Sequence, residues 1–403
     1  MRYPTVPSYV ESRCIHLHCG WQRSGGIVKI DFAGVGYKNS WMDELPMPSQ
    51  VRATGPRAEA NTPDLIEPPS VKLIVRLFLI PLLIVAAAVG VMFLIGLLAG
   101  REPTLEEAVA RLKAPGGERT SNYLVGPASK QRYLDAKTLV DKMKASEGMT
   151  EAERIALASQ LIDIVDNHTQ AAEGEVQHFI LLALGRTWQK NPAQPALNSP
   201  QAIESRNQVV ATLLKYADAP ELATRKAAVL ATVYLAGQDE TSAIIPKIIE
   251  KLKDPKEDLD VRIAAATVLG PLSDSSNQPV IEALNLAMRN SDPRESELVW
   301  SATLSLAELN QTEVADTILK LLDRKELAQL QYYDRESDPK NPKFRNLSDQ
   351  EEQRILINTM LGARKLQVSA VQEQLKKLTE TDPSSRVREA GRELFQQDEK
   401  ATK

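Results

Sequence analysis

The chain has 403 residues, a net charge of −4 and 43% hydrophobic residues, enough to form a sizeable core. Residues 101–403 contain 40 Lys and Arg against 46 Asp and Glu, interspersed along the sequence. This composition excludes the basic stripe of a nucleic-acid-binding repeat protein. Both cysteines, Cys14 and Cys19, lie near the N-terminus, so the rest of the chain has no disulfide framework.

Residues 1–70 differ in composition from everything that follows. They end in a Pro-rich stretch and show no hydrophobic periodicity, so we expect a disordered leader. An alternative is that the reading frame starts later, at Met42 or Met47. A start at Met47 would mean that residues 1–46 are not translated.

Four soft metal ligands lie close together in this leader: Cys14, His16, His18 and Cys19. Zinc sites usually separate paired ligands by two to four residues and hold them on a small fold, which this segment lacks. We therefore predict no metal and no cofactor.

Residues 77–99 form a run of 23 positions without a charged residue. As a helix this run would be about 34 Å long, enough to cross a bilayer core of about 30 Å. We predict one transmembrane helix within residues 71–100, in contact with lipid through residues 77–99. We also predict that this helix is a retained signal anchor, because the apolar run is longer than the apolar segment of a cleaved signal peptide. Lys72 and Arg76 favour an inside N-terminus in a bacterial inner membrane, but the side of the downstream domain stays open.

Residues 101–150 are expected to form a stalk and capping helices. The pattern predicts a short helix over 105–112, a Pro-Gly-Gly break at 115–117 and a longer amphipathic helix over 131–144. This segment is interpreted as a cap or a degenerate first repeat, because terminal repeats are atypical where one face meets solvent.

A short phrase recurs through residues 151–397: a turn, often Asp-Pro, and then a helix rich in small apolar residues. The clearest copy starts at Asp254 and continues through Val261 and Arg262 to Leu269 and Gly270. We call the position of Arg262 the anchor position. Its equivalents recur at spacings of 34 to 54 residues, at Gln177, Arg225, Trp300, Arg354 and Arg388.

Each anchor helix is preceded by an amphipathic segment with apolar residues at three- and four-residue spacing. We predict these partner helices near residues 152–166, 201–217, 244–252, 278–290, 312–323 and 368–380. No alternating strand pattern occurs after residue 101. The predicted fold is therefore all-α: an α-solenoid of about six helix pairs over residues 151–397, followed by a tail at 398–403.

The turn, the Val-Arg pair, the Ala-Ala pair and the Leu-Gly pair resemble HEAT repeats of the bacterial, phycobilisome-lyase-like type over residues 150–397. The resemblance implies an armadillo-like helical solenoid in which alanines let successive helices approach closely. The repeat family includes scaffolds, adaptors, lyases and nucleic-acid enzymes, so the resemblance implies an architecture and not one function.

Two features of the repeats are candidates for binding. Arg225, Arg262 and Arg388 would either line a groove or hydrogen-bond to turn carboxylates and carbonyls of a neighbouring repeat, and we favour the second interpretation. The insertion at residues 331–348 contains two tyrosines, a phenylalanine and several basic residues, which makes it the best candidate contact loop. The alternative for the insertion is a merely tolerated surface loop.

The repeat region contains no cysteine, only the histidines His168 and His178, and no glycine-rich phosphate loop or nucleophile elbow. We predict no catalytic, cofactor-binding or metal-binding residue, and we interpret both histidines as structural. One segment is rich in lysine: Lys247, Lys251, Lys253 and Lys256. We interpret it as a solvated helix face, and nucleic acid is not an expected partner.

Together these patterns predict a membrane-anchored, non-catalytic scaffold or adaptor that binds other proteins through a solenoid surface. The alternative, which the resemblance implies, is a lyase or chaperone-like factor that acts on a cofactor-bearing protein. The sequence identifies neither the partner nor the oligomeric state.

Overall fold

The computed structural model describes residues 82–83, 85–87, 89–92, 103–114, 128–144, 149–170, 173–190, 197–290, 292–334, 337–338 and 341–401. The chain divides into two compact units, one formed by Met1–Gly20 and Glu102–Lys403 and the other by Trp21–Arg101. The predicted leader at 1–70, with its cysteine and histidine cluster, lies outside the described residues.

The second unit is described only at positions between 82 and 92, and these positions are helical. Most of the predicted span at 77–99 is therefore outside the described residues. Within the part of the chain that the structure describes, no helix has the length and apolar character needed to cross a membrane.

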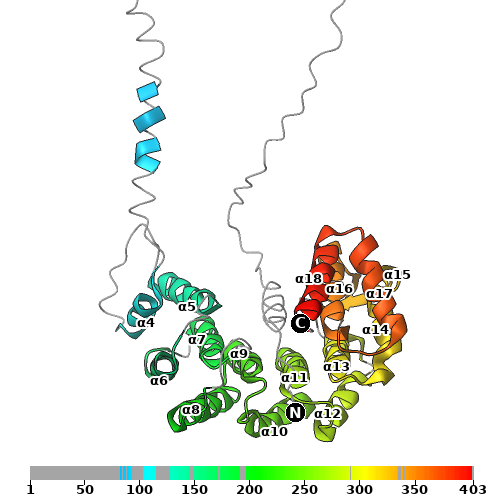
Figure 1. Ribbon diagram of the computed structural model, residues 1–403, viewed down its shortest axis with the longest axis horizontal. Coiled ribbons are helices and arrows are strands. Elements are labelled where there is room, and N and C mark those ends of the chain that lie inside the picture. Colours follow the sequence, from blue (N-terminus) through cyan, green and yellow to red (C-terminus); the bar gives the residue numbers. More distant parts are fainter. Residues whose placement is uncertain are drawn as a thin grey trace, which may run out of the picture. The chain divides into compact units, whose positions relative to one another are not determined.

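The first unit consists mainly of α-helices, which follow one another in chain order (Figure 1). The predicted helices are confirmed to within a few residues at each end. Their bounds are α4 Leu105–Lys113, α5 Ala128–Lys144, α6 Glu151–Asn167, α7 Gly174–Arg186, α8 Pro200–Tyr216, α9 Leu222–Ala231, α10 Thr241–Lys253, α11 Leu259–Leu272, α12 Gln278–Met288, α13 Ser296–Glu308, α14 Ala315–Leu321, α15 Arg324–Leu327, α16 Asp349–Ala363, α17 Ser369–Thr381 and α18 Ser385–Ala401. Short 3₁₀ turns accompany them: η3 Thr232–Leu235, η4 Pro293–Glu295 and η5 Thr312–Val314.

The helices alternate between two roles. The anchor helices α7, α9, α11, α13, α16 and α18 carry the anchor positions, and each one contacts the next in this order. Each is also packed against the partner helix before it: α6, α8, α10, α12, α14 or α17. Helices α4 and α5 pack on each other in the same way, and they contact α6 and α7 respectively.

Helix starts follow from local capping chemistry. Thr150 and Glu153 form a capping box at α6, and Ser348 and Glu351 form one at α16, so each pair satisfies two backbone N–H groups that the helix leaves free. At α8, the Ser199 side chain accepts a hydrogen bond from the backbone N–H of Ala202 and proline occupies the first helical position.

Small residues allow the anchor helices to approach closely. Residues 263–270 of α11 are all buried, and Ala264, Ala265 and Ala266 are among them. At Gly185 in α7, an added Cβ would overlap the carbonyl oxygen of Ala231 in α9. The anchor helices thus pack backbone to backbone at these points, which larger side chains would prevent.

The insertion between α14 and α16 contains a β-hairpin, which the sequence analysis did not predict. Strands β1 (Gln331–Tyr333) and β2 (Phe344–Asn346) pair antiparallel, with Tyr332 opposite Arg345. The sequence shows no alternating pattern here because three-residue strands are too short to produce a recognisable alternation.

Candidate interaction surface

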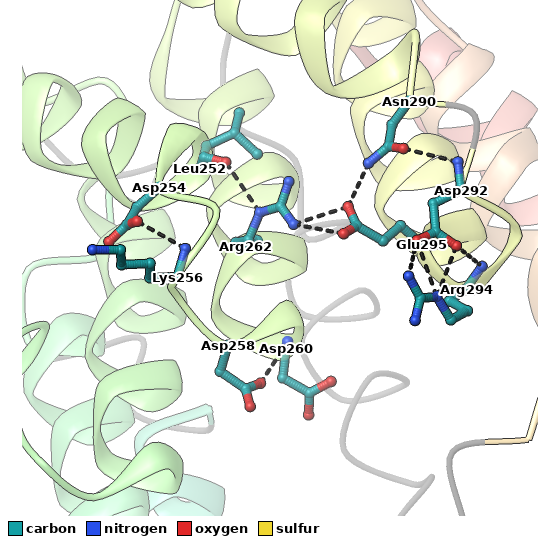
Figure 2. Close-up of polar contacts among 10 residues, drawn as sticks. All are labelled: Leu252, Asp254, Lys256, Asp258, Asp260, Arg262, Asn290, Asp292, Arg294 and Glu295. Atoms are coloured by element: carbon teal, nitrogen blue, oxygen red, sulfur yellow. Dashed lines mark hydrogen bonds and ion pairs between the residues drawn. The ribbon is translucent and has the colours of Figure 1, made fainter. Parts of the chain in front are cut away.

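The anchor arginine Arg262 joins two successive helix pairs. Its Nε donates to the carbonyl oxygen of Leu252, 3.4 Å away in the partner helix α10, and its Nη1 lies 2.9 Å from both carboxylate oxygens of Glu295 in the next turn (Figure 2). Both side chains are largely buried, with 14% and 22% exposure. The Arg262 guanidinium therefore hydrogen-bonds both to its own helix pair and to the following helix pair.

Arg225 follows the same pattern, and Arg388 shares the contact with carbonyls of its own turn. Arg225 donates from Nη1 to the carbonyl oxygens of Ala219 and Pro220, and from Nε to Glu257 of the next turn at 3.2 Å. Arg388 donates to carbonyl oxygens of its own turn, those of Asp382 and Pro383. These contacts support the interpretation that the anchor arginines hydrogen-bond to turns within the array.

Figure 2 also shows how the accepting carboxylate is held in place. Asn290 donates from Nδ2 to Glu295 at 2.5 Å, and its Oδ1 accepts from the backbone N–H of Asp292 at 2.9 Å. Arg294 pairs with Asp292 in turn, and this hydrogen bond holds the pKa of the Asp292 carboxyl below its usual range. The turn before α13 is thus held by hydrogen bonds of its own in addition to the contact from Arg262.

Arg132 in α5 makes a junction of the same kind, which the sequence analysis missed. It is 2% exposed and donates to the carbonyl oxygens of Leu112 and His168, and to the carboxylate of Glu173 at 2.7 Å. The phrase around Arg132 lacks the Val-Arg and Ala-Ala pattern, so only the spacing to the next repeat would have identified it.

The series of anchor arginines is interrupted at Trp300. In place of a forward ionic bond, Trp300 of α13 stacks on Tyr332 of the hairpin, with ring centroids 6.5 Å apart. The Tyr332 hydroxyl donates to Glu297 at 2.8 Å, and Arg354 of α16 reaches the same Glu297 oxygen at 3.4 Å. The hairpin is therefore attached to α13 at the one anchor position that carries an aromatic residue.

A second attachment holds the hairpin to α16. Arg345 of β2 forms a bidentate pair with Glu351, at 2.8 Å and 2.7 Å, and lies 4.9 Å over the Tyr332 ring. These hydrogen bonds from Arg345 lower the pKa of Glu351 to about 2. Together with Tyr332, this pair attaches both strands of the insertion to neighbouring helices.

One hollow lies beside Trp300, and a second lies at the other ends of the helices. A cavity of about 60 Å³ is lined by Ile263, Glu297, Trp300, Ser301, Leu304, Arg354, Ile355, Asn358 and Thr359. A cleft of about 840 Å³ lies at the C-terminal ends of α11, α13 and α16, lined by Ser273, Asp274, Ser275, Glu308, Leu309, Asn310, Arg364, Lys365, Gln367 and Gln372. The cleft contains two acidic and two basic side chains, so its walls carry no net charge.

The histidines have structural surroundings. The carbonyl oxygen of His168 accepts a hydrogen bond from Arg132, and Nε2 of His168 lies 3.6 Å from Asp163. His178 is 7% exposed, and its ring is edge-on to the ring of Phe179. Among the residues that the structure describes, no cluster of histidine, cysteine and carboxylate side chains has the geometry of a metal site.

Two of the four lysines in the lysine-rich segment, Lys247 and Lys251, are paired with carboxylates. Lys251 pairs with Glu257 at 2.7 Å and with Asp218 at 2.9 Å, and Lys247 pairs with Asp218 at 3.0 Å. These carboxylates reduce the positive charge that this segment could offer to phosphate groups. No protein-family model matches the chain, and no curated protein matches it in sequence.

Proposed function

We propose that this chain is a membrane-anchored, non-catalytic scaffold that binds other proteins through a solenoid of HEAT-like helix pairs. The observation that carries the proposal is the repeated junction between pairs: Arg225 to Glu257 and Arg262 to Glu295 use the same groups at corresponding positions. A junction that recurs between corresponding residues generates an extended array, in which each repeat contacts its neighbours.

The chemistry of the described residues supports a role in contact. The anchor arginines Arg225 and Arg262 are bonded to carbonyls and carboxylates inside the array. Extended helical arrays present long surfaces built from many small contributions, which suits the recognition of another polypeptide.

The proposed membrane anchor is the apolar run at residues 77–99. Its described positions include large apolar side chains that are more than half exposed, such as Leu82 at 65%, Val89 at 60% and Met92 at 74%. Such exposure is costly in water and is expected of a lipid-facing helix. Tethering would raise the effective concentration of the repeats near other membrane components.

The hairpin insertion is the contact element that we propose first. It is attached at Tyr332 and Arg345, whereas Phe344 is 38% exposed. An exposed aromatic side chain on an immobilised loop is the kind of residue that dominates binding energy in protein interfaces.

The test is co-purification. The full-length chain, solubilised gently from membranes, would be compared by quantitative mass spectrometry with a truncated chain that retains only residues 1–101. We expect stoichiometric polypeptides that are lost with the repeats. Recovery of the same polypeptides with both chains would contradict the proposal, and a pigment bound to the full-length chain would favour the lyase or chaperone-like alternative.

A further inference from the structure

We propose that the outer edge of β2 binds an extended segment of a partner protein as a third strand of the hairpin sheet. The segment would carry an acidic side chain beside Lys343 and an apolar side chain beside Phe344. This inference rests on the proposed scaffold function and specifies the kind of contact that it uses.

The backbone of β2 has an open edge. Just beyond the Tyr333 and Phe344 pair, the N–H of Asp334 donates to the carbonyl of Lys343 at 2.9 Å, while the Lys343 N–H donates to Oγ of Ser337 at 3.1 Å. The bond from Asp334 to Lys343 has the position of the ladder bond that flanks a non-hydrogen-bonded pair. Hydrogen-bonded and non-hydrogen-bonded pairs alternate in an antiparallel ladder. Phe344, opposite Tyr333, is therefore in a non-hydrogen-bonded pair, and its N–H and C=O point away from β1.

No hydrogen bond reaches these two Phe344 groups within the described part of the chain. By contrast, β1 contacts the η4 turn at Pro293–Glu295, and the side chain of its Tyr332 is stacked on Trp300. All three residues of β2 are exposed. The sheet thus has one covered edge and one edge that can accept a strand.

The hairpin that carries this edge is held in place by contacts with neighbouring helices. Arg345 is fixed by two hydrogen bonds to Glu351, and the Tyr332 hydroxyl is fixed by Glu297. A strand that docks on an immobilised hairpin loses less conformational entropy than one that must also order its receptor.

The side chains of β2 select the occupant. Lys343 and Arg345 are two residues apart and lie on the same face, and Lys343 makes no ion pair among the described residues. A second copy of the chain, paired antiparallel about Phe344, would place Lys343 opposite Arg345 of that copy. Like charges directly opposite destabilise a ladder, whereas an acidic residue beside Lys343 stabilises it.

The other face selects for an apolar neighbour. Phe344 packs against Tyr333 with ring centroids 5.9 Å apart, and 38% of Phe344 remains exposed. A β-branched side chain on the added strand would cover this aromatic pair, since aromatic and β-branched cross-strand pairs are favourable. The matching segment therefore alternates acidic and apolar residues.

The test uses the full-length chain in detergent and a blocked, dye-labelled peptide of alternating Glu and Val, with binding followed by fluorescence anisotropy. F344P removes the outward N–H without removing a bond to β1, and F344A removes the same aromatic ring but keeps the N–H. We expect F344P to bind roughly tenfold more weakly than F344A, because one backbone bond to the peptide is lost. Equal affinities, with equal unfolding midpoints for the two variants, would overturn the proposal.

Two further peptides test the chemistry of the occupant. Methylation of each valine nitrogen removes donors from one edge of the peptide, and replacement of each Glu with Lys reverses its charge. We expect both changes to abolish saturable binding. Binding of the lysine peptide as tight as that of the Glu peptide would overturn the choice of an acidic partner.

The scaffold function is tested separately. If F344P retains the proteins that co-purify with the full-length chain and binds the peptide as F344A does, the edge is not the docking site and the scaffold proposal stands. Failure of the scaffold proposal would show instead as the absence of repeat-dependent partners in the wild-type chain.

Discussion

Arg262 and Glu295 are 33 residues apart in the chain, and the guanidinium of the first contacts both carboxylate oxygens of the second. This contact joins one helix pair to the next at a largely buried position. We expect a double-mutant cycle of R262A and E295A to give a coupling energy of about 1–3 kcal/mol, from urea unfolding of the single and double variants. Coupling within error of zero would show that the contact contributes nothing.

Arg132 should be more sensitive to substitution than any exposed residue of α5. Replacing it with methionine would leave the Glu173 carboxylate without its cation and two carbonyls without a donor. We expect R132M to lose about 3–5 kcal/mol of unfolding free energy, since one member of a buried pair is removed. K137M, at an exposed position of the same helix, is the control, and an equal effect in both variants would contradict the prediction.

Gly185 should not tolerate a methyl group. An added Cβ there meets the backbone oxygen of Ala231, which cannot move without shifting α9, whereas at Gly174 it meets only side-chain atoms of Glu221, with Cγ at 2.8 Å. We expect G185A to destabilise the fold by about 1–3 kcal/mol and G174A to have little effect. Thermal unfolding of the two variants measures the difference, and similar losses in both would refute the backbone explanation.

The Arg345 and Glu351 pair should make the hairpin attachment dependent on pH. The pKa of Glu351 is lowered from 4.5 to about 2 in the folded chain, so the pair contributes stability above pH 4.5. That contribution is lost as the pH falls from 4.5 towards 2, because the unfolded chain then binds the proton more readily. We expect the stability difference between wild type and E351Q to shrink over this range. E373Q, at an exposed position of α17, should show no such change.

Trp300 should stabilise the attachment of the hairpin to α13. Substitution with leucine removes the stacking on Tyr332 while α13 keeps an apolar residue. Because aromatic pairs contribute about 0.5–1.5 kcal/mol, we expect proteolysis within residues 331–348 to accelerate roughly two- to tenfold. L286A, at an exposed position of α12, is the comparison, and an equal acceleration there would show that the stacking is unimportant.

Much of the helical architecture could be predicted from the sequence. The apolar spacing located α6 and α17 to within one residue at each end, because each helix buries a single face against its neighbours. Local capping residues, such as Thr150 at α6, determine where these helices begin. Both signals are contained in short windows of sequence.

The junctions could not be predicted in the same way. Arg262 was an evident candidate, but the identity of Glu295 as its partner depends on how two helix pairs stack. Arg132 escaped notice because its function depends on three distant acceptors and on no local pattern. The hairpin escaped notice because its two strands are three residues each, and their pairing is stabilised by contacts from Trp300 and Glu351 that lie outside the insertion.

The pair formed by α10 and α11 carries both halves of the junction: Glu257 accepts from the preceding pair, and Arg262 donates to the following one. A unit of this kind is compatible with a copy of itself placed head to tail. Duplication of such a unit would create a new junction with the correct chemistry, and deletion would bring Arg225 to Glu295. The length of the array can therefore change in whole units during evolution without any new ionic contact being invented.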